Sequence, residues 1–246
     1  MKLQHQTILI TGGSSGIGLE LAKQLINLQN TVIICGRSEE KLSAAKQLLP
    51  QLITIACDIS NDNDRMKLHE FIQQHYPNCN VLINNAAIVH RVDFRADVLM
   101  VRKAQAEINT NLLAPIALTK LFLPLFENTP NPAIINITTG LIYAPRAEYP
   151  IYNATKAALH SFTQVLRYRL KETKVNVFEV MMPVVDTPWH NGDVPKIAIT
   201  AEVAVLKMLK GIEKGKPEVK VGAVKLLYFI SRISPKLAFR LINGVS

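Results

Sequence analysis

Short runs of isoleucine, valine and leucine recur along the chain, and the stretches between them carry apolar residues at helical spacing. The apolar runs are continuous rather than alternating, which is typical of strands buried on both faces of a parallel sheet. These runs predict strands at Thr7–Thr11, Thr31–Gly36, Leu52–Ala56, Val81–Asn84, Ala133–Thr138, Val175–Met182 and Glu218–Val221. The stretches between them predict helices at Ile17–Leu28, Ser38–Leu48, Asp62–Tyr76, Asp97–Phe126, Ile151–Lys171 and Ala201–Lys214.

The regular alternation of strand and helix predicts an α/β fold. We expect residues 1–246 to form a single doubly wound, Rossmann-like domain, with a parallel sheet of about seven strands and helices on both of its faces. The sequence contains no repeat, no low-complexity stretch and no linker that would divide it.

The composition, with 48% hydrophobic and 19% charged residues, is that of a globular domain with a sizeable core. Cys35, Cys57 and Cys79 lie in or beside apolar runs and form no CxxC pair, so we expect reduced thiols in the core. The first residues, MKLQHQTILI, carry no signal-peptide cleavage site. No uninterrupted apolar run reaches the roughly 18 residues of a membrane span. These features predict a cytoplasmic protein.

The last part of the chain is strongly basic. Most of the formal charge of +9 lies from Val205 onward, where nine Lys or Arg stand against two Glu. Residues 224–246 have the pattern of two basic amphipathic helices on either side of a proline: Leu226, Phe229, Ile230 and Ile233 share one face, Lys225 and Arg232 share another, and Lys236 and Arg240 follow Pro235. Such a pair packs on its own fold or on a partner subunit, covers a subunit interface or the substrate pocket, or lies on an anionic membrane surface. The absence of a helix-turn-helix pattern argues against nucleic acid as a partner.

A glycine-rich turn, TGGSSGIG, connects the first predicted strand to the first predicted helix. Backbone N–H groups and the positive end of a helix dipole meet at such a turn and attract phosphate. Gly12 permits the tight turn, Gly16 lets a pyrophosphate approach the backbone, and Gly18 lets the helix pack closely. The candidate cofactor-binding residues here are Gly12, Ser14, Ser15, Gly16, Ile17 and Gly18. The alternative is a glycine turn with a structural role alone.

The end of the second predicted strand, ICGRSEEK, indicates which cofactor is preferred. Folds that prefer NAD usually carry an acid here for the ribose hydroxyls. This chain has Gly36 and Arg37 instead, and a guanidinium is suited to a phosphate group. We therefore expect NADP(H) rather than NAD(H). The alternative is that Arg37 is a solvated residue at a helix start.

Several motifs together resemble the short-chain dehydrogenase/reductase family: TGGSSGIG, CDIS, NNAA, Asn111, INITTG and YNATK occur in the family's order and at its spacings. The resemblance extends over about residues 7 to 222. It implies an oxidoreductase that moves hydride between a nicotinamide cofactor and a carbonyl or alcohol substrate, which is a small molecule and can be hydrophobic. INITTGLIYAP, YNATKAALHSFTQVLR and the basic tail are also similar to a bacterial branch of the family associated with D-alanine transfer to cell-envelope polymers.

The resemblance implies four catalytic residues: Asn111, Thr139, Tyr152 and Lys156. Tyr152 and Lys156 lie four apart on a predicted helix and hence on one face. Tyr152 is the expected general acid or base, with its pKa lowered by the Lys156 ammonium and by the oxidised nicotinamide. Lys156 also holds the nicotinamide ribose in the family, and Asn111 corresponds to the asparagine that holds a water of the proton relay.

Two departures from the family pattern keep a second interpretation open. Thr139 stands where a serine usually lies, thirteen residues before Tyr152, and its β-branch restricts the side chain. In MMPVVDTP, Val184 replaces a glycine. The alternative to an enzyme is therefore a nucleotide-binding sensor or scaffold on the same fold with little turnover.

The resemblance also implies further contacts. Cofactor contacts are expected from Asp58 at the adenine, from Thr187 at the carboxamide, and from Ile59, Asn85, Val185, Tyr152 and Lys156. Candidates for the substrate wall are Ile142, Tyr143, Tyr149 and Trp189, and no metal is expected. Members of the family commonly form homodimers or homotetramers through the two long helices, here Asp97–Phe126 and Ile151–Lys171.

Overall fold

The computed structural model describes residues 1–190, 192 and 194–244 of the chain. Its centre is a 7-stranded sheet in the order β3-β2-β1-β4-β5-β6-β9, and every neighbouring pair in it is parallel. The strands are β1 (Thr7–Thr11), β2 (Thr31–Gly36), β3 (Ile53–Ala56), β4 (Cys79–Asn84), β5 (Ala133–Thr139), β6 (Asn176–Met182) and β9 (Glu218–Lys220). The predicted fold class is thus confirmed, and each predicted strand is present within two residues of its expected bounds.

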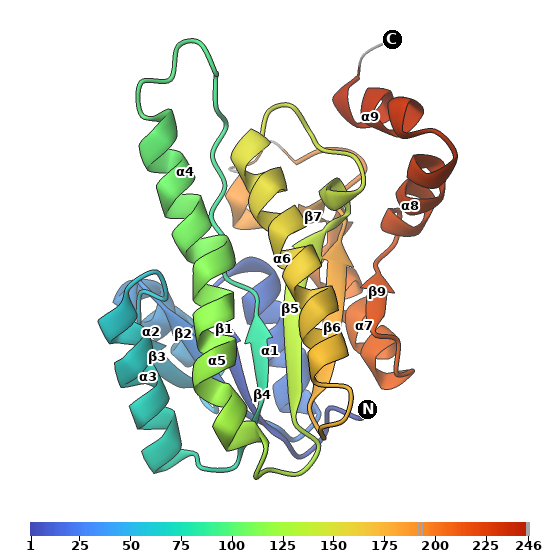
Figure 1. Cartoon of the computed structure of the whole chain (residues 1–246). Helices are drawn as coiled ribbons and strands as arrows, with labels where there is room; N and C mark the ends of the chain where they lie inside the picture. The colour runs from blue at the N-terminus through green and yellow to red at the C-terminus, as the bar shows by residue number, and fades with distance from the viewer. Residues whose placement is uncertain (191, 193, 245–246) are drawn as a thin grey trace.

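Helices cover both faces of this sheet (Figure 1). They are α1 (Gly16–Asn27), α2 (Glu39–Leu48), α3 (Asp62–His75), α4 (Met100–Ile108), α5 (Ala114–Phe126), α6 (Pro150–Arg169), α7 (Ala201–Glu213), α8 (Val224–Ile233) and α9 (Pro235–Asn243). One core layer joins α1, α2 and α7 to the sheet and includes Leu21, Leu42 and Met208. The other joins α3 and α5 to the opposite face and includes Leu68 and Phe122.

The strand order fixes where a ligand can lie. The chain runs from β1 outward to β3 and then returns through α3 to β4, which pairs with β1 on its other side. In a doubly wound sheet, this reversal opens a crevice at the carboxyl ends of the two strands. The glycine turn follows β1 and the NNAA segment follows β4, so both border the crevice.

The helix predicted at Asp97–Phe126 begins later and is not uniform. It starts at Met100, and a π-helical segment at Asn109–Leu113 separates α4 from α5. The helical run Met100–Glu127 is long and apolar enough to cross a membrane by length and composition, which the uninterrupted apolar runs alone did not indicate. In the fold it is a core helix, because Leu118, Phe122 and Phe126 are fully buried against the sheet.

One further element was not predicted, whereas the two helices expected in the tail are present. A short parallel ladder joins β7 (Val185–Asp186) to β8 (Ile199–Thr200). The tail forms the two helices α8 and α9, drawn in red, on the side of the molecule toward which the β4 arrow points (Figure 1). The three cysteines are buried free thiols, as expected.

Candidate active site

The glycine turn has the conformation that its residues predict. Gly12 and Gly16 have positive φ angles of 65° and 52°, a backbone region that favours glycine. A Cβ on Gly18 would lie 2.2 Å from the Gly12 carbonyl oxygen, so the turn and the first helical turn touch backbone to backbone. The Ser15 side chain makes no capping hydrogen bond at the start of α1. The N-terminal amides of α1 therefore keep the capacity to bind a phosphate, and the glycines leave the room it needs.

Two neighbouring segments close around this turn. The Asn85 amide donates to the carbonyl oxygens of Thr11 and Gly12 at 3.0 and 3.1 Å. On the other side, a Cβ on Gly16 would lie 3.3 Å from the Thr187 side chain. The structure thus brings together three predicted cofactor contacts that lie far apart in the sequence: the glycine turn, Asn85 and Thr187. Val185, in β7, has a buried side chain just before Thr187.

The end of β2 lies against the same turn. A Cβ on Gly36 would lie 3.4 Å from Ser14 Oγ, and the next residue, Arg37, is exposed. Ser38 caps α2 by accepting a hydrogen bond from the Lys41 amide at 3.2 Å. The segment from Gly36 to Ser38 presents a cation and one hydroxyl group, with no acid to bind ribose hydroxyls.

Asp58 and Ile59 follow β3, and the structure separates their roles. Asp58 Oδ1 accepts hydrogen bonds from the amide and the hydroxyl of Ser60, at 3.0 and 2.7 Å. The Ile59 side chain is buried in the core layer that contains Leu68. If Ile59 contacts the cofactor, it therefore does so through its backbone atoms rather than through its side chain.

The predicted catalytic side chains converge where β5 ends and α6 begins. Thr139 is the last residue of β5, and its hydroxyl lies close enough to Tyr152 on α6 to lower the pKa of the phenol. Lys156 is one helical turn further along α6, with Nζ 5.9 Å from the centroid of the Tyr152 ring. Lys156 is buried, and its Nζ donates to the Ile137 carbonyl oxygen at 2.9 Å. The threonine that replaces the usual serine therefore keeps a hydroxyl at the tyrosine.

The electrostatics of the site differ from the expectation in one respect. Burial raises the pKa of Tyr152 to about 12, with a further contribution from the Glu107 carboxylate, and the Thr139 hydrogen bond acts in the opposite direction. Burial also lowers the pKa of Lys156 to about 8, against the effect of Glu179. The expected lowering of the Tyr152 pKa by Lys156 is not found, because Lys156, with a pKa of about 8, has lost its proton before Tyr152, with a pKa of about 12, ionises. A phenolate requires additional positive charge beside the ring.

Asn111 lies in the π-helical segment and is fully buried. Its Oδ1 accepts from the Ile88 amide at 2.9 Å, and its Nδ2 donates to the Ile88 carbonyl and to Thr155 Oγ1 at 2.8 and 3.2 Å. Both polar atoms of the side chain are therefore occupied in fixing the loop after β4 to α6. A relay water held by this residue would bind its backbone, which a π-helical segment frees from the regular hydrogen-bond ladder.

A buried acid near Tyr152 was not predicted. Glu107, on α4, is fully buried, and its Oε1 accepts from the His90 amide at 2.8 Å and lies 2.9 Å from His90 Nδ1. Oε2 has no hydrogen-bond partner among the described residues. Burial raises the pKa of Glu107. The signal in the sequence is an acid on the apolar side of a core helix, close to Asn111.

A second unpredicted acid lies beneath α6. Glu179, in the middle of β6, is fully buried and accepts a 2.6 Å hydrogen bond from the Thr138 hydroxyl. Its other oxygen lies 2.8 Å from Nδ1 of His160 on α6. The signal here is a glutamate within the apolar run VFEVMM.

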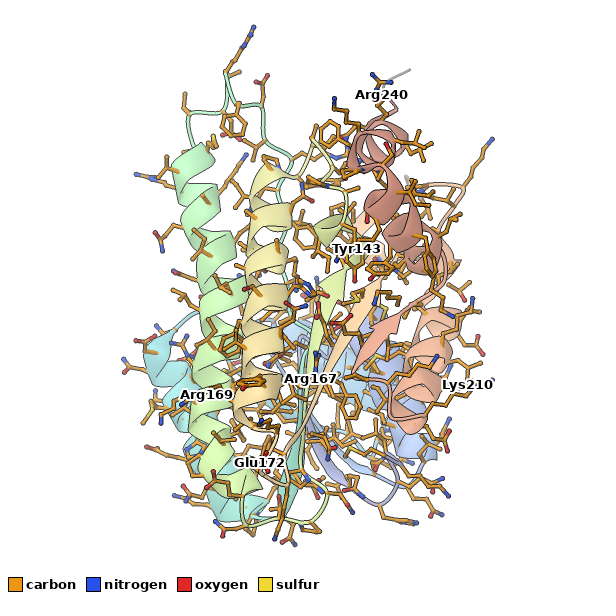
Figure 2. The ribbon with its side chains drawn as sticks, turned by 45° about the vertical axis from the view of Figure 1, so that its right-hand side comes forward. Tyr143, Arg167, Arg169, Glu172, Lys210 and Arg240 are labelled. Carbon is orange, nitrogen blue, oxygen red and sulfur yellow. The ribbon has the colours of Figure 1, made fainter. Side chains whose placement is uncertain are left out.

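The four candidate wall residues fall into separate groups. Tyr149 and Trp189 pack edge to face, with ring centroids 5.7 Å apart, where α6 begins. Ile142 instead lines a cavity of about 400 Å³ between α6 and Phe239 of α9. Tyr143 packs on Tyr228 of α8 at 5.0 Å, and it is labelled in Figure 2 where the chain after β5 meets the tail. Tyr149 and Trp189 are thus together, whereas Ile142 and Tyr143 face the tail.

The described residues contain no group of three His, Cys, Asp or Glu side chains that could hold a metal ion. What the site offers is a phosphate-binding turn at the switch point of the sheet and a tyrosine, lysine and hydroxyl triad at the next strand end. These features define a nicotinamide-dependent oxidoreductase on a doubly wound sheet.

Comparison with known proteins gives the family. A sequence model described as short chain dehydrogenase matches residues 6–197, and the chain belongs to that family. It is 43% identical over 248 residues to the uncharacterized oxidoreductase DltE of Bacillus subtilis, covering 99% of this chain and 98% of that protein. This likeness confirms the family and the branch that the motifs resemble. The chain is an NAD(P)-dependent dehydrogenase or reductase, and such enzymes generally act on small molecules.

Two solved structures illustrate the fold. A short chain dehydrogenase from Burkholderia cenocepacia, in complex with NADP, has a TM-score of 0.86 at 24% identity and covers 98% of this chain and 99% of its own. A short chain dehydrogenase/reductase from Burkholderia phymatum, in complex with NAD, has a TM-score of 0.83 at 16% identity, with 95% and 96% covered. The two structures share the fold and differ in the cofactor bound.

Proposed function

We propose that the protein is an NADP(H)-dependent oxidoreductase in which Tyr152 is the general acid and base for a carbonyl or alcohol substrate. The observation that carries this proposal is the placement of the Thr139 hydroxyl close enough to Tyr152 to lower its pKa, with Lys156 one turn away on the same helix. The hydroxyl of Thr139 is thus in the position that the chemistry requires, next to the phenol of Tyr152. The same contact argues against a sensor without turnover.

The cofactor, when bound, supplies hydride to the carbonyl carbon or accepts it from the alcohol carbon. In reduction, Thr139 donates a hydrogen bond to the substrate oxygen, and Tyr152 transfers its phenolic proton to the same atom, which gives the alcohol. Lys156 holds positive charge beside the phenolate that remains. The phenolate then takes a proton from solvent, and the reverse sequence oxidises the alcohol.

The preference for NADP(H) rests on the end of β2. Arg37 is exposed there, directly after Gly36, which lies against Ser14 of the glycine turn, and a guanidinium binds a phosphate through charge-assisted hydrogen bonds. The relative with NADP bound supports this choice, whereas the relative with NAD bound means that the fold alone does not select between the two cofactors.

The substrate is, in this proposal, a small carbonyl or alcohol with hydrophobic character. Tyr149 and Trp189 give the mouth of the site two aromatic walls, which favour apolar over charged groups.

For the oligomeric state we propose a homodimer or homotetramer. Apolar side chains on the outer faces of the long helices support it: Val101 on α4, Leu113 before α5, and Val165 and Tyr168 on α6 are exposed. Light scattering of the purified protein measures the mass directly, and a monomer at micromolar concentration contradicts this part.

The function is tested by measuring oxidation of NADPH and of NADH by the purified protein with a panel of aldehydes, ketones and quinones. We expect turnover with NADPH that Tyr152→Phe lowers by roughly 10²–10⁴-fold while NADPH still binds. NADPH binding without reduction of any carbonyl supports the sensor instead. Equal activity of the wild type and of Tyr152→Phe contradicts the assigned role of Tyr152.

A further inference from the structure

The tail helices are held on the body of the protein through one side only. Val224, at the start of α8, packs on Gly140, where a Cβ would lie 3.0 Å from Val224 Cγ2. At the other end, the Asn243 side chain accepts from the Ala147 amide at 2.7 Å and donates to the Pro145 carbonyl at 3.0 Å. These contacts fix which faces of α8 and α9 point outward.

The outward face of α8 is apolar. Leu226, Phe229 and Ile233 follow each other at intervals of three and four residues, and 64%, 63% and 86% of their surfaces are exposed. The same holds for Leu237 and Leu241 on α9, with 49% and 58% exposed. A surface helix normally turns such a stripe toward the core. Exposed apolar clusters of this kind mark sites that another surface covers.

The charge around this face has one sign. Exposed Lys225, Arg232, Lys236 and Arg240 accompany the apolar residues, and residues 224–246 contain no Asp or Glu. Arg240 lies on the outer helix α9, remote from Lys210 on α7 in the same view (Figure 2). The partner of the tail must therefore offer both an apolar layer and negative charge.

We propose that the α8–α9 pair (Val224–Asn243) docks the protein on an anionic phospholipid membrane. The acyl boundary of a bilayer takes up the apolar side chains, and anionic headgroups pair with the cations. A second copy of the chain suits this face less well. In a twofold contact, the same four cations of both copies would meet with no acid in the tail to balance them.

The docking surface is also connected to the active site. Gly140, on which Val224 packs, directly follows Thr139, and Phe239 of α9 lines the cavity beside α6. Docking therefore holds the loop after β5 close to the lipid surface. This consequence rests on the proposed function, whereas the docking itself does not.

The test is sedimentation of the full chain with vesicles of phosphatidylcholine alone and with vesicles that also contain phosphatidylglycerol, whose headgroup is anionic. We expect binding to the anionic vesicles only. Lys236→Gln with Arg240→Gln should weaken it roughly 25-fold, at about fivefold for each cation. Phe229→Ser with Ile233→Ser should abolish it, while NADPH binding is kept.

Matched controls carry the same changes elsewhere. Lys207→Gln with Lys210→Gln removes two exposed cations from α7, and Leu48→Ser with Met66→Ser removes exposed apolar side chains from α2 and α3. Both controls should bind the vesicles as the wild type does. Equal binding by the tail variants and the wild type overturns the proposal. Failure of the wild type to bind anionic vesicles also overturns the proposal. If, in addition, Phe229→Ser with Ile233→Ser disrupts the oligomer, the face is a subunit contact instead.

Discussion

The Glu179 carboxylate lies fully buried 2.8 Å from Nδ1 of His160, and Lys156 precedes His160 by one turn of α6. The carboxylate partly offsets the lowering of the Lys156 pKa that burial causes. Glu179 is thus a positioning residue for the charge of Lys156, held in place by Thr138 and His160.

Glu179→Gln should move the alkaline limb of kcat/KM for reduction to lower pH. Loss of the negative charge lowers the Lys156 pKa below about 8, so the ammonium loses its proton earlier as pH rises. The measurement is a pH profile with NADPH and any accepted carbonyl. Glu218→Gln is the control, because Glu218 on β9 is a partly buried acid that does not act on Lys156. Identical profiles for the wild type and Glu179→Gln contradict the assignment.

Thr139→Ala should lower kcat/KM about 10- to 100-fold, which corresponds to one hydrogen bond to a charged group. It should also raise the pKa of Tyr152 further, because the Thr139 hydrogen bond acts against the effect of burial. Alcohol oxidation needs the deprotonated tyrosine. A higher Tyr152 pKa therefore moves the pH at which kcat/KM for oxidation rises to a higher value. Thr139→Ser keeps the hydroxyl and should retain activity and profile. A Thr139→Ala enzyme with the wild-type profile would refute the role of this contact.

Most of the fold followed from hydrophobic patterning, because a parallel sheet buried on both faces requires continuous apolar strands. Differences arise where tertiary contacts outweigh the pattern. β4 begins at Cys79 rather than Val81, since Asn80 is held inside the sheet by accepting from the Thr7 amide and donating to the Pro130 carbonyl. The π-helical segment has no signature in hydrophobicity, and within it the Asn111 side chain bonds the backbone of Ile88, a contact between distant parts of the chain.

The candidate site was predictable where the motif itself carries the chemistry. Tyr152, Lys156 and Thr139 are brought together as their spacing indicated. Glu107 and Glu179 were missed because their partners, His90 and His160, come from other elements. The raised pKa of Tyr152 could not be predicted from the sequence either, since it depends on burial and on a carboxylate from another helix.

Glu107→Gln should stabilise the protein at pH 8 by about 1 kcal/mol, because it removes a buried charge with an unpaired oxygen. The folded-state pKa of Glu107 is raised, so the penalty grows as pH rises above the ordinary value of 4.5 and disappears below it. Thermal unfolding should give a melting temperature about 2–4 °C higher at pH 8 and unchanged at pH 4.

The same Glu107→Gln variant should lower the pKa of Tyr152, on which Glu107 acts. Glu172→Gln, an exposed change in the turn after α6 that is labelled in Figure 2, should alter neither quantity. A destabilised Glu107→Gln protein at pH 8 would mean that the His90 contact outweighs the burial of the charge.

Arg37→Ala should raise the Kd for NADPH about 10- to 100-fold, the range of a charge-assisted hydrogen bond. The Kd for NADH should change less than twofold, since NADH has no 2′-phosphate for the guanidinium to bind. Fluorescence titration of both cofactors measures the two constants. Lys41→Ala provides the control, because it removes an exposed cation from the first turn of the adjacent α2. An equal loss of affinity for both cofactors would make Arg37 a structural residue of the loop. An unchanged NADPH affinity would make it a solvated residue at the start of a helix, and the preference for NADP(H) would then need another source.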